Sequence, residues 1–289
     1  MSIKIAIASG KGGTGKTTVS VNLYYFMQEY WSKNIQLVDC DVEEPDDVIF
    51  FPEAVKNTEN EVTQLIPEID TNKCTFCRKC VEYCEFNAIV VIPPVKYAEV
   101  NASLCHSCGA CSVACQDHAI TEKPLLIGKV TLYSTGMGNG LLEGRLRIGS
   151  AMQTMVIRKL KKEPDIKNDI IIYDAPPGTS CPVIITVANA DYIILVTEPT
   201  PFGLHDLKLT IDMLKAIDKP YGVIVNKAGL GNEEIYEFLE EENIELLGKI
   251  PYHKRYAAKY AIGGLLQNIP EKFKNYYIEI IDKLKNKLS

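Results

Sequence analysis

The fold of this chain is decided by the stretch Ser9-Gly10-Lys11-Gly12-Gly13-Thr14-Gly15-Lys16-Thr17-Thr18. It follows an apolar run of strand length, Ile3 to Ala8, and precedes a helical pattern from Thr17 to about Tyr30. Residues 10–17 satisfy the pattern G-x4-G-K-[ST]. A glycine-rich loop in this position turns its backbone N–H groups toward a phosphate, and the helix N-terminus adds its dipole. The sequence therefore predicts a nucleotide-binding loop in which Lys16 reaches the β- and γ-phosphates and the Thr17 hydroxyl ligates Mg²⁺.

An additional lysine, Lys11, makes the loop read K-G-G-T-G-K-T-T, which resembles the deviant Walker A motif of the MinD/ParA/Mrp and nitrogenase iron protein class of ATPases. The resemblance implies that Lys11 reaches across a dimer interface to phosphates bound by the partner subunit. It also implies that Asp41, after a strand at 35–39, is the switch I aspartate that positions water or magnesium. Asp174, which ends the apolar run 170–174, is similar to the family's Walker B aspartate.

Two further segments carry the same resemblance. Pro176-Pro177-Gly178 is similar to the family's switch II segment, whose glycine senses the γ-phosphate. Asn226 ends another apolar run, where the family's asparagine contacts the adenine edge. Because GTPases carry N-K-x-D and the fourth position here is Gly229, the sequence favours ATP over GTP. The implied catalytic residues are Lys11, Lys16 and Asp41. The implied Mg²⁺ ligands are Thr17, Asp41 and Asp174. The implied nucleotide contacts are Gly10, Lys11, Gly12, Gly13, Thr14, Gly15, Lys16, Thr17, Thr18, Gly178 and Asn226.

The apolar runs predict an α/β fold with a mostly parallel, doubly wound sheet of the P-loop NTPase type. Strands are expected near 3–8, 35–39, 128–133, 169–174, 191–197, 221–226 and 245–250. They alternate with helical patterns, which places helices on both faces of the sheet. We expect the P-loop domain to comprise residues 1–66 and 124–289, interrupted by an inserted domain at 67–123.

Eight of the ten cysteines lie in a repeated pattern within that insert. Cys74, Cys77, Cys80 and Cys84 read C-x2-C-x2-C-x3-C, and Cys105, Cys108, Cys111 and Cys115 repeat the pattern 31 residues later. Such density in a reducing compartment indicates metal binding rather than disulfides. Three thiolates at i, i+3 and i+6 on a tight loop occupy three corners of a cubane, so the fourth has to come from elsewhere in the chain.

This pattern resembles that of bacterial ferredoxins with two [4Fe–4S] clusters, in which the fourth cysteine of each run ligates the other cluster. The resemblance implies a small α+β ferredoxin-like domain. It implies a first cluster held by Cys74, Cys77, Cys80 and Cys115. It implies a second cluster held by Cys84, Cys105, Cys108 and Cys111. The proline that usually follows the fourth cysteine is Glu85 in one run and Gln116 in the other, which removes no ligand. The alternative is zinc, although zinc motifs rarely repeat three cysteines at two-residue gaps.

Composition and charge exclude several classes of protein. The chain has 289 residues, 46% of them hydrophobic and 24% charged, which excludes wholesale disorder. Its formal net charge of −6 argues against a general nucleic-acid binder, because such proteins need a basic face. No run approaches the roughly 20 apolar residues of a membrane span, and the first residues do not resemble a signal peptide. We therefore expect a cytoplasmic protein with no nucleic-acid partner and no stable membrane insertion.

Several other features have two interpretations each. Cys181 lies seven residues after Asp174, where the nitrogenase iron protein has a cysteine that ligates an intersubunit cluster. A second such cysteine is absent from 136–141, so a buried structural cysteine is favoured for Cys181, and packing for Cys40. Apolar residues at helical spacing from Phe273 onward predict a core-facing last helix rather than the membrane-binding helix of MinD. The charged, glycine-rich segment 136–149 is expected to line a dimer or partner interface.

These features favour two functions over a third. The first is an Mg-ATP-dependent dimeric ATPase, formed with itself or with a paralogue, that couples ATP hydrolysis to electron transfer from its two clusters to a partner protein. The second is an assembly or carrier ATPase of the Mrp type for iron–sulfur clusters or other metallocofactors. A carrier needs a labile, under-ligated site, typically a C-x-x-C pair in the C-terminal half, and this chain has none. The third function, a positioning protein of the MinD type, leaves the cysteines unexplained.

Overall fold

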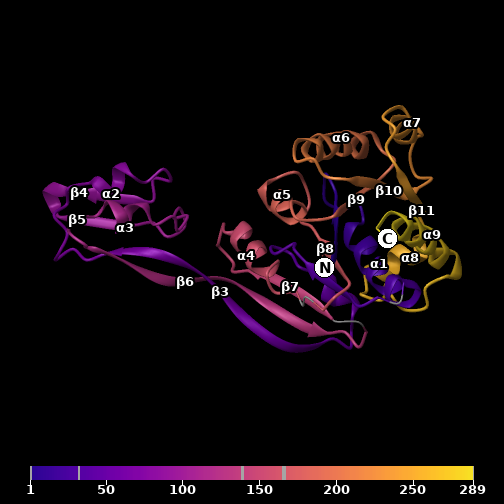
Figure 1. The fold of residues 1–289 in the computed structure, drawn as a ribbon, viewed down its shortest axis with the longest axis horizontal. Helices are drawn as coiled ribbons and strands as arrows, with labels where there is room; N and C mark the ends of the chain where they lie inside the picture. The colour runs from indigo at the N-terminus through magenta and orange to yellow at the C-terminus, as the bar shows by residue number, and fades with distance from the viewer. Residues whose placement is uncertain (1, 32, 138–139, 165–166, 289) are drawn as a thin grey trace. The chain divides into compact units, whose positions relative to one another are not determined.

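The computed structural model describes residues 2–31, 33–137, 140–164 and 167–288. The chain divides into two compact units (Figure 1). Unit 1 comprises Met1–Asn60, Lys129–Arg145 and Gln153–Ser289, and unit 2 comprises Glu61–Gly128 and Leu146–Met152. Unit 2 includes the whole of the stretch 67–123 that contains the cysteine repeat.

The large sheet has the strand order β11-β10-β9-β1-β8-β2-β7-β6-β3. Its strands are β1 (Ile3–Ala8), β2 (Ile35–Asp39), β3 (Val55–Ile69), β6 (Ile120–Ser134), β7 (Leu141–Leu146), β8 (Ile170–Asp174), β9 (Tyr192–Thr197), β10 (Tyr221–Ala228) and β11 (Leu246–Pro251). The pairs from β11 through to β7 are all parallel. The expectation of a mostly parallel α/β sheet is therefore confirmed.

The helices of unit 1 pack on both faces of this sheet. They are α1 (Lys16–Trp31), α4 (Gln153–Leu160), α5 (Cys181–Val187), α6 (Pro201–Ala216), α7 (Glu234–Glu241), α8 (Lys254–Tyr260) and α9 (Glu271–Leu288), with a short 3-10 turn η1 (Asp47–Phe50). Figure 1 shows α5 and α6 on the face of the sheet opposite to α1 and α9. The last helix faces the core as expected, since its buried residues are Phe273, Tyr277, Ile280, Ile281 and Leu284.

Two strands of the large sheet, β3 and β7, were not expected from the sequence. β3 is a 15-residue edge strand whose first seven residues are all exposed, so it lacks the apolar run that identified the other strands. β6 is also 15 residues long, and the boundary between the two units falls within both strands. Lys129 pairs with Glu59, and Lys123 pairs with Glu68, so the partners run in opposite directions and the two strands are antiparallel.

The segment 136–149, expected to line a dimer or partner interface, is not a loop in its central part, because Leu141–Leu146 forms β7 within the sheet. Its role at an interface stays a prediction. Glu143 is only 2% exposed there and forms an ion pair with Arg145 at 3.0 Å. A buried carboxylate requires such a partner, and this pairing explains how charged residues fit inside a strand. Gly138 and Asn139, which the same expectation covered, lie outside the described residues.

The parallel strands bring the predicted functional groups to one edge of the sheet. The loop at 9–15 follows β1, Asp41 follows β2, and Asp174 ends β8. Since β1, β8 and β2 are neighbours and parallel, their carboxyl ends meet at the same edge. Ligands of open α/β sheets bind in the crevice outside these ends.

Unit 2 contains a small second sheet and two short helices. These elements are β4 (Ile89–Ile92), β5 (Tyr97–Val100), α2 (Lys79–Glu82) and α3 (Ala110–Ala114), with a 3-10 turn η2 (Pro93–Val95). β4 and β5 pair in an antiparallel hairpin. The buried cluster around them consists of Cys80, Ile89, Val91 and Cys111. Two of its four members are cysteines, so unit 2 has little apolar core of its own.

Candidate functional site

The loop between β1 and α1 requires glycine at several positions. Gly13 and Gly15 have φ values of 78° and 92°, in the left-handed region that favours glycine. A Cβ at Gly15 would lie 2.1 Å from the side-chain nitrogen of Asn226. That nitrogen donates to the carbonyl of Thr14 at 2.7 Å. Asn226 therefore holds the loop in place, and its expected contact with the adenine edge stays a prediction.

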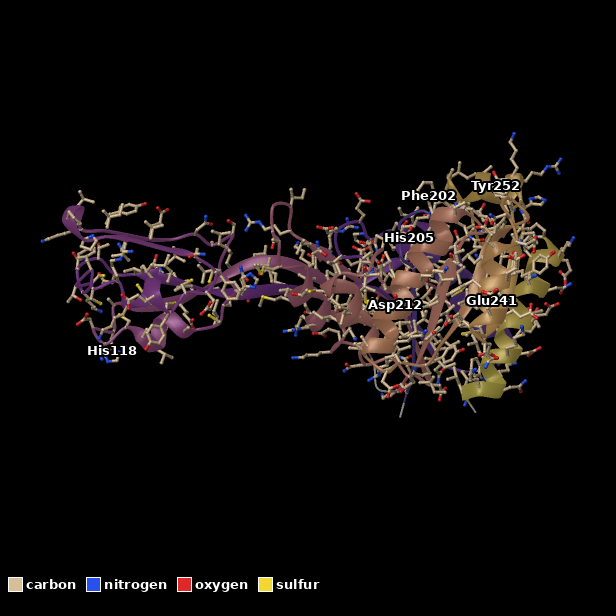
Figure 2. The ribbon with its side chains drawn as sticks, turned by 90° about the horizontal axis from the view of Figure 1, so that it is seen from above. His118, Phe202, His205, Asp212, Glu241 and Tyr252 are labelled. Carbon is tan, nitrogen blue, oxygen red and sulfur yellow. The ribbon has the colours of Figure 1, made fainter. Side chains whose placement is uncertain are left out.

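The start of α6 packs closely against the same loop. A Cβ at Gly10 would lie 2.4 Å from the backbone oxygen of Asp206, so no larger residue fits. Figure 2 labels Phe202 and His205 on this first part of the helix. The glycine pattern of the loop thus has two causes, positive φ and close approach of α6.

Three side chains from the start of α1 converge on Asp174 at the end of β8. Lys16 Nζ lies 3.4 Å from Asp174 Oδ1. The Thr17 hydroxyl donates to Oδ2 at 3.0 Å, and the Ser20 hydroxyl donates to Oδ1 at 2.9 Å. Burial raises the pKa of the Asp174 carboxyl, against the effect of Lys16 and the two hydroxyls. The structure therefore brings together Lys16, Thr17 and Asp174, and adds Ser20, which the motif did not single out.

The segment after β2 is organised by a buried carboxylate, Asp39. Its two oxygens accept backbone N–H groups from Asp41 (3.0 Å), Asp46 (2.9 Å) and Asp47 (3.1 Å). Asp46 in turn accepts the Thr17 hydroxyl at 3.3 Å. Asp39 thus fixes the loop that carries Asp41. Asp39 precedes Asp41 in the pattern D-C-D, but the resemblance assigned a role only to Asp41.

Negative charge accumulates beside Lys16. In the described part of the chain, Asp39, Asp46 and Asp47 are the one group of His, Cys, Asp or Glu side chains whose ligand atoms lie within 4.8 Å of one another. Asp47 is fully buried, and neither of its carboxylate oxygens has a hydrogen-bond partner. Burial and the neighbouring aspartates raise the pKa of Asp39 and of Asp47 well above the ordinary value. Burial opposes the charged form of Lys16, yet the carboxylates of Asp174, Asp41, Asp39 and Asp47 raise its pKa.

This crowding predicts a pH-dependent stability that can be measured. Burial raises the pKa of Asp41 from 3.8 to about 6, with Lys16 opposing the shift. The native state therefore holds a proton that the unfolded state has released, and the free energy of unfolding falls as pH rises from about 4 to about 6. We expect wild type to lose about 1–2 kcal/mol relative to Asp41→Asn over this range, less than the full shift implies because Asp41 is partly exposed.

The measurement is thermal unfolding of wild type and Asp41→Asn, without nucleotide or Mg²⁺, at several pH values between 4 and 7. Titrating groups that do not interact with Asp41 cancel in the comparison of the two proteins. A difference in Tm that stays constant across this range contradicts the prediction.

Lys11 lies in an ion-pair network within its own chain. Its Nζ lies 2.6 Å from Oε1 of Glu198, at the end of β9. The other oxygen of Glu198 accepts from Lys227 at 2.8 Å, and Lys227 also donates to the carbonyl of Gly13 at 2.7 Å. Burial works against ionisation of Glu198, but the two lysines hold its pKa below the usual range. In the sequence, Glu198 directly follows the strand expected at 191–197, and nothing there indicated its ion pairs.

A cavity of about 370 Å³ opens beside the loop. The predicted site residues that line this cavity are Lys11, Gly12, Gly13, Thr14, Gly15, Lys16, Thr17, Thr18, Asp41 and Asn226. Its opposite wall comes from β11 and α8 and includes Tyr252, His253, Tyr256 and Tyr260. The Tyr260 hydroxyl donates to Asp46 at 3.0 Å, which ties this wall to the loop after β2. The tyrosines that follow β11 in the sequence indicated an aromatic wall, but no role was assigned to them.

Gly178 and the other two cysteines occupy distinct environments. The Gly178 backbone N–H donates to the carbonyl of Ser9 at 3.0 Å, so the segment after β8 contacts the start of the loop.

Cys40 is fully buried, as packing requires. Cys181 is exposed at the start of α5, so the expectation that it is buried is wrong.

The eight cysteines of unit 2 line two cavities. The first cysteine cavity contains Cys74, Cys77, Cys80 and Cys115. The second cysteine cavity contains Cys84, Cys105, Cys108 and Cys111. Each cavity therefore gathers three cysteines from one run of the repeat and the fourth from the other run. His118, labelled in Figure 2, lies in this unit.

The backbone repeats with the same 31-residue shift as the sequence. Positive φ occurs at Phe76 and its counterpart Ser107 (56° and 52°), and at Asn87 and its counterpart His118 (51° and 48°). The Phe76 N–H donates to Cys74 Sγ at 3.3 Å, and the Ser107 N–H donates to its own cysteine at 3.4 Å. Backbone N–H groups that point at sulfur stabilise thiolates, which are the form that binds metal.

The spacing of the sulfurs distinguishes two kinds of metal site. Zinc held by four cysteines at about 2.3 Å brings the sulfurs to about 3.8 Å from one another. Across the described residues, the group of three aspartates above is the one set of ligand atoms that lies within 4.8 Å, so the cysteines are spaced more widely. No three cysteine sulfurs among the described residues are as close together as zinc would require.

The site has a glycine-rich loop between a parallel strand and a helix. A lysine and a threonine from the start of that helix contact an aspartate at the end of a neighbouring strand. This arrangement defines a P-loop nucleotide-binding protein. A family model described as the CobQ/CobB/MinD/ParA nucleotide binding domain matches residues 5–266. The chain belongs to this family, and it has the fold of a MinD/ParA-type P-loop ATPase.

Comparisons with individual proteins agree with this family. An uncharacterised protein of Methanocaldococcus jannaschii is 33% identical over 281 residues, which is 96% of this chain and 95% of that protein. A Pyrococcus furiosus protein named iron-sulfur cluster carrier protein is 26% identical, with 99% of this chain and 86% of that protein covered. The structure of the Pyrococcus furiosus cell division ATPase MinD has a TM-score of 0.58 at 20% identity and covers both chains completely. In the described part of the chain, no helix is both long enough and apolar enough to cross a membrane.

Proposed function

We propose that the 370 Å³ cavity binds Mg-ATP and that the chain hydrolyses it as a dimer. Lys16 and the backbone N–H groups of the loop hold the phosphates. Thr17, Asp41 and Asp174 hold Mg²⁺, and the 3.0 Å contact between the Thr17 hydroxyl and Asp174 supports this assignment. Gly178 and Asn226 complete the nucleotide contacts implied by the family.

Hydrolysis transfers the γ-phosphoryl group to water, and the bond between the γ-phosphorus and ADP breaks. Asp41 positions the attacking water. Lys11 of each subunit supplies positive charge to the site of the other, as an arginine finger does. Because Lys11 is paired with Glu198 in the single chain, dimer formation has to replace that ion pair with one to phosphate. The partner is a second copy of this chain or a paralogue.

We infer that the stretch 67–123 is an inserted ferredoxin-like domain and that each cysteine cavity holds one [4Fe–4S] cluster. The donor set supports this assignment, since each cavity has four sulfurs, wide spacing and backbone N–H groups directed at sulfur. A bound cluster supplies reversible storage of one electron. The eight thiolates act as ligands, and the residues around them set how readily each cluster is reduced.

The favoured function is ATP-dependent electron transfer to a partner protein. One observation carries it: both cavities contain a complete set of four cysteines, as permanent redox clusters require. A cluster that is cargo needs an incomplete site from which it can leave. The second candidate is an iron–sulfur cluster carrier. It is favoured by the name of the Pyrococcus furiosus relative, which is 26% identical to this chain.

The test measures whether bound nucleotide changes the reduction potentials of the clusters. The chain passes from Asp41 to β3, which enters unit 2, so a change in the loop after β2 has a direct covalent route to that unit. A typical coupling of about 1–3 kcal/mol corresponds to roughly 40–130 mV for a one-electron couple. Anaerobic redox titration by EPR without nucleotide, with ADP and with a non-hydrolysable ATP analogue measures this shift. If the cluster potentials and the rates of acceptor reduction are the same in all three nucleotide states, ATP-dependent electron transfer is contradicted. Transfer of a cluster to an apo-protein would then favour the carrier function.

A further inference from the structure

The two cysteine cavities have different linings at equivalent positions of the repeat. In the first cavity, the Thr75 hydroxyl donates to Asp117 at 2.6 Å. Their counterparts 31 residues away are His106 and Phe86, and both line the second cavity. These two rings are stacked, with centroids 3.8 Å apart and an interplanar angle of 15°. A polar pair therefore lines one cavity where an aromatic stack lines the other.

The charges around the cavities differ in the same way. Arg78 and Lys79 line the first cavity, and their counterparts in the second cavity are Gly109 and Ala110. With Asp117 included, the side chains that line the first cavity carry one net positive charge. Among the described residues that line the second cavity, none is Asp, Glu, Lys or Arg.

One acidic residue lies near the second cavity and has no counterpart at the first. A Glu122 carboxylate oxygen lies 4.0 Å from the position that a Cβ on Gly109 would occupy. The residue equivalent to Glu122 is Val91, which lines the first cavity. The field of this carboxylate thus disfavours further negative charge at the second cavity.

The backbone hydrogen bonds to sulfur do not distinguish the cavities. The Ala88 N–H donates to Cys84 Sγ at 3.3 Å, and its counterpart, the Ala119 N–H, donates to Cys115 Sγ at 3.3 Å. Since these contacts match across the repeat, the side chains remain as the source of any difference.

We propose that the cluster in the first cysteine cavity has the higher reduction potential and accepts an electron first. Reduction adds one negative charge to a cluster that is already negative, so nearby cations favour it, and carboxylates and an apolar lining oppose it. Arg78 and Lys79 at the first cavity, and Glu122 and the apolar lining at the second, act in the same direction, whereas Asp117 acts against it and offsets one of the two cations. The proposal depends on the proposed function, because it assumes that both cavities hold [4Fe–4S] clusters.

This difference gives electron flow within unit 2 a direction. One electron leaves the reduced cluster of the second cavity and enters the oxidised cluster of the first, so one site is oxidised and the other is reduced, with no proton required. The electron is supplied to the protein by an external one-electron donor, which is dithionite in the experiment below. We expect at least a tenfold preference for the first cavity, which is about 59 mV for a one-electron couple.

The experiment moves the cations from one cavity to the other. Arg78→Gly with Lys79→Ala removes them from the first cavity, and glycine tolerates the φ of 67° at position 78. Gly109→Arg with Ala110→Lys adds them to the second cavity. Position 109 has a φ of 76°, close to the 67° that Arg78 adopts at the equivalent position, and a Cβ there meets nothing closer than 4.0 Å. Lys96→Asn is the control, because it removes one positive charge from unit 2 without touching either lining.

Anaerobic EPR redox titration of the full chain should show two midpoint potentials in wild type. Removal of the cations should lower the higher midpoint, their addition should raise the lower one, and the combined variant should reverse the order. The control should move neither midpoint by as much. A single midpoint in wild type, or shifts assigned to the opposite cavities, overturns the proposal. Iron analysis and spin counting come first, because protein without iron overturns the proposed function and this inference together, whereas loaded protein with equal potentials overturns only the inference.

Discussion

Replacing Lys16 by alanine should remove most ATP binding and abolish hydrolysis. Lys16 is the one lysine that reaches Asp174 from the glycine-rich loop, and it lies among aspartates that raise its pKa. A hydrogen bond to a charged group contributes about 1.5–3 kcal/mol, so nucleotide affinity should fall about 10- to 150-fold. Calorimetric titration with ADP and ATP measures the loss. Lys33→Ala, at an exposed position, is the control and should bind like wild type.

Lys11→Ala should give a different phenotype. If Lys11 acts on the phosphates of the partner subunit, its loss removes charge stabilisation of the transferring group, and hydrolysis should fall about 10²- to 10³-fold with ATP binding largely kept. Glu198→Gln removes the ion-pair partner but leaves the lysine, so it should retain hydrolysis. Steady-state phosphate release and dimerisation with the non-hydrolysable analogue distinguish the variants. Normal hydrolysis by Lys11→Ala would show that the lysine has no role in trans.

The second large effect concerns iron. Anaerobically purified protein should contain about eight irons per chain with a broad absorbance near roughly 400 nm. Cys84→Ser should damage the cluster in the second cysteine cavity, although Cys84 belongs to the first run of the repeat. Stoichiometric zinc with little iron would contradict the assignment.

Double variants locate the damage. Adding Cys108→Ser to Cys84→Ser should cause little further loss of iron, because both residues line the second cavity. Adding Cys77→Ser should damage the other site as well. Cys181→Ser, at an exposed position outside both cavities, is the control and should keep its iron. The opposite pattern for Cys77 and Cys108 would mean that each run holds its own cluster.

Local patterns predicted the loop and the buried strands well. The glycine positions, Lys16 and Thr17 are fixed by residues adjacent in sequence, and apolar runs such as 170–174 identify buried parallel strands. The resemblance to bacterial ferredoxins implied the grouping of each fourth cysteine with the opposite run, and the two cavities contain the same sets. Such features depend on spacing along the chain, which the sequence records directly.

The remaining features depend on contacts between distant residues. Asp39 holds the loop after β2 through backbone N–H groups, which no side-chain pattern reveals. Glu198 meets Lys11 only after β9 is placed beside β1. β3 and β7 carry polar or charged residues, so periodicity alone does not separate them from loops.

The shared fourth cysteine has an evolutionary consequence. Because Cys84 lines the cavity of the second run and Cys115 lines that of the first, neither 31-residue half surrounds a cavity with four sulfurs on its own. An ancestral single unit of this kind could have completed its ligand sets only by pairing with another copy of itself. The repeat within one chain makes that association covalent, and loss of either half would remove cysteines from both cavities.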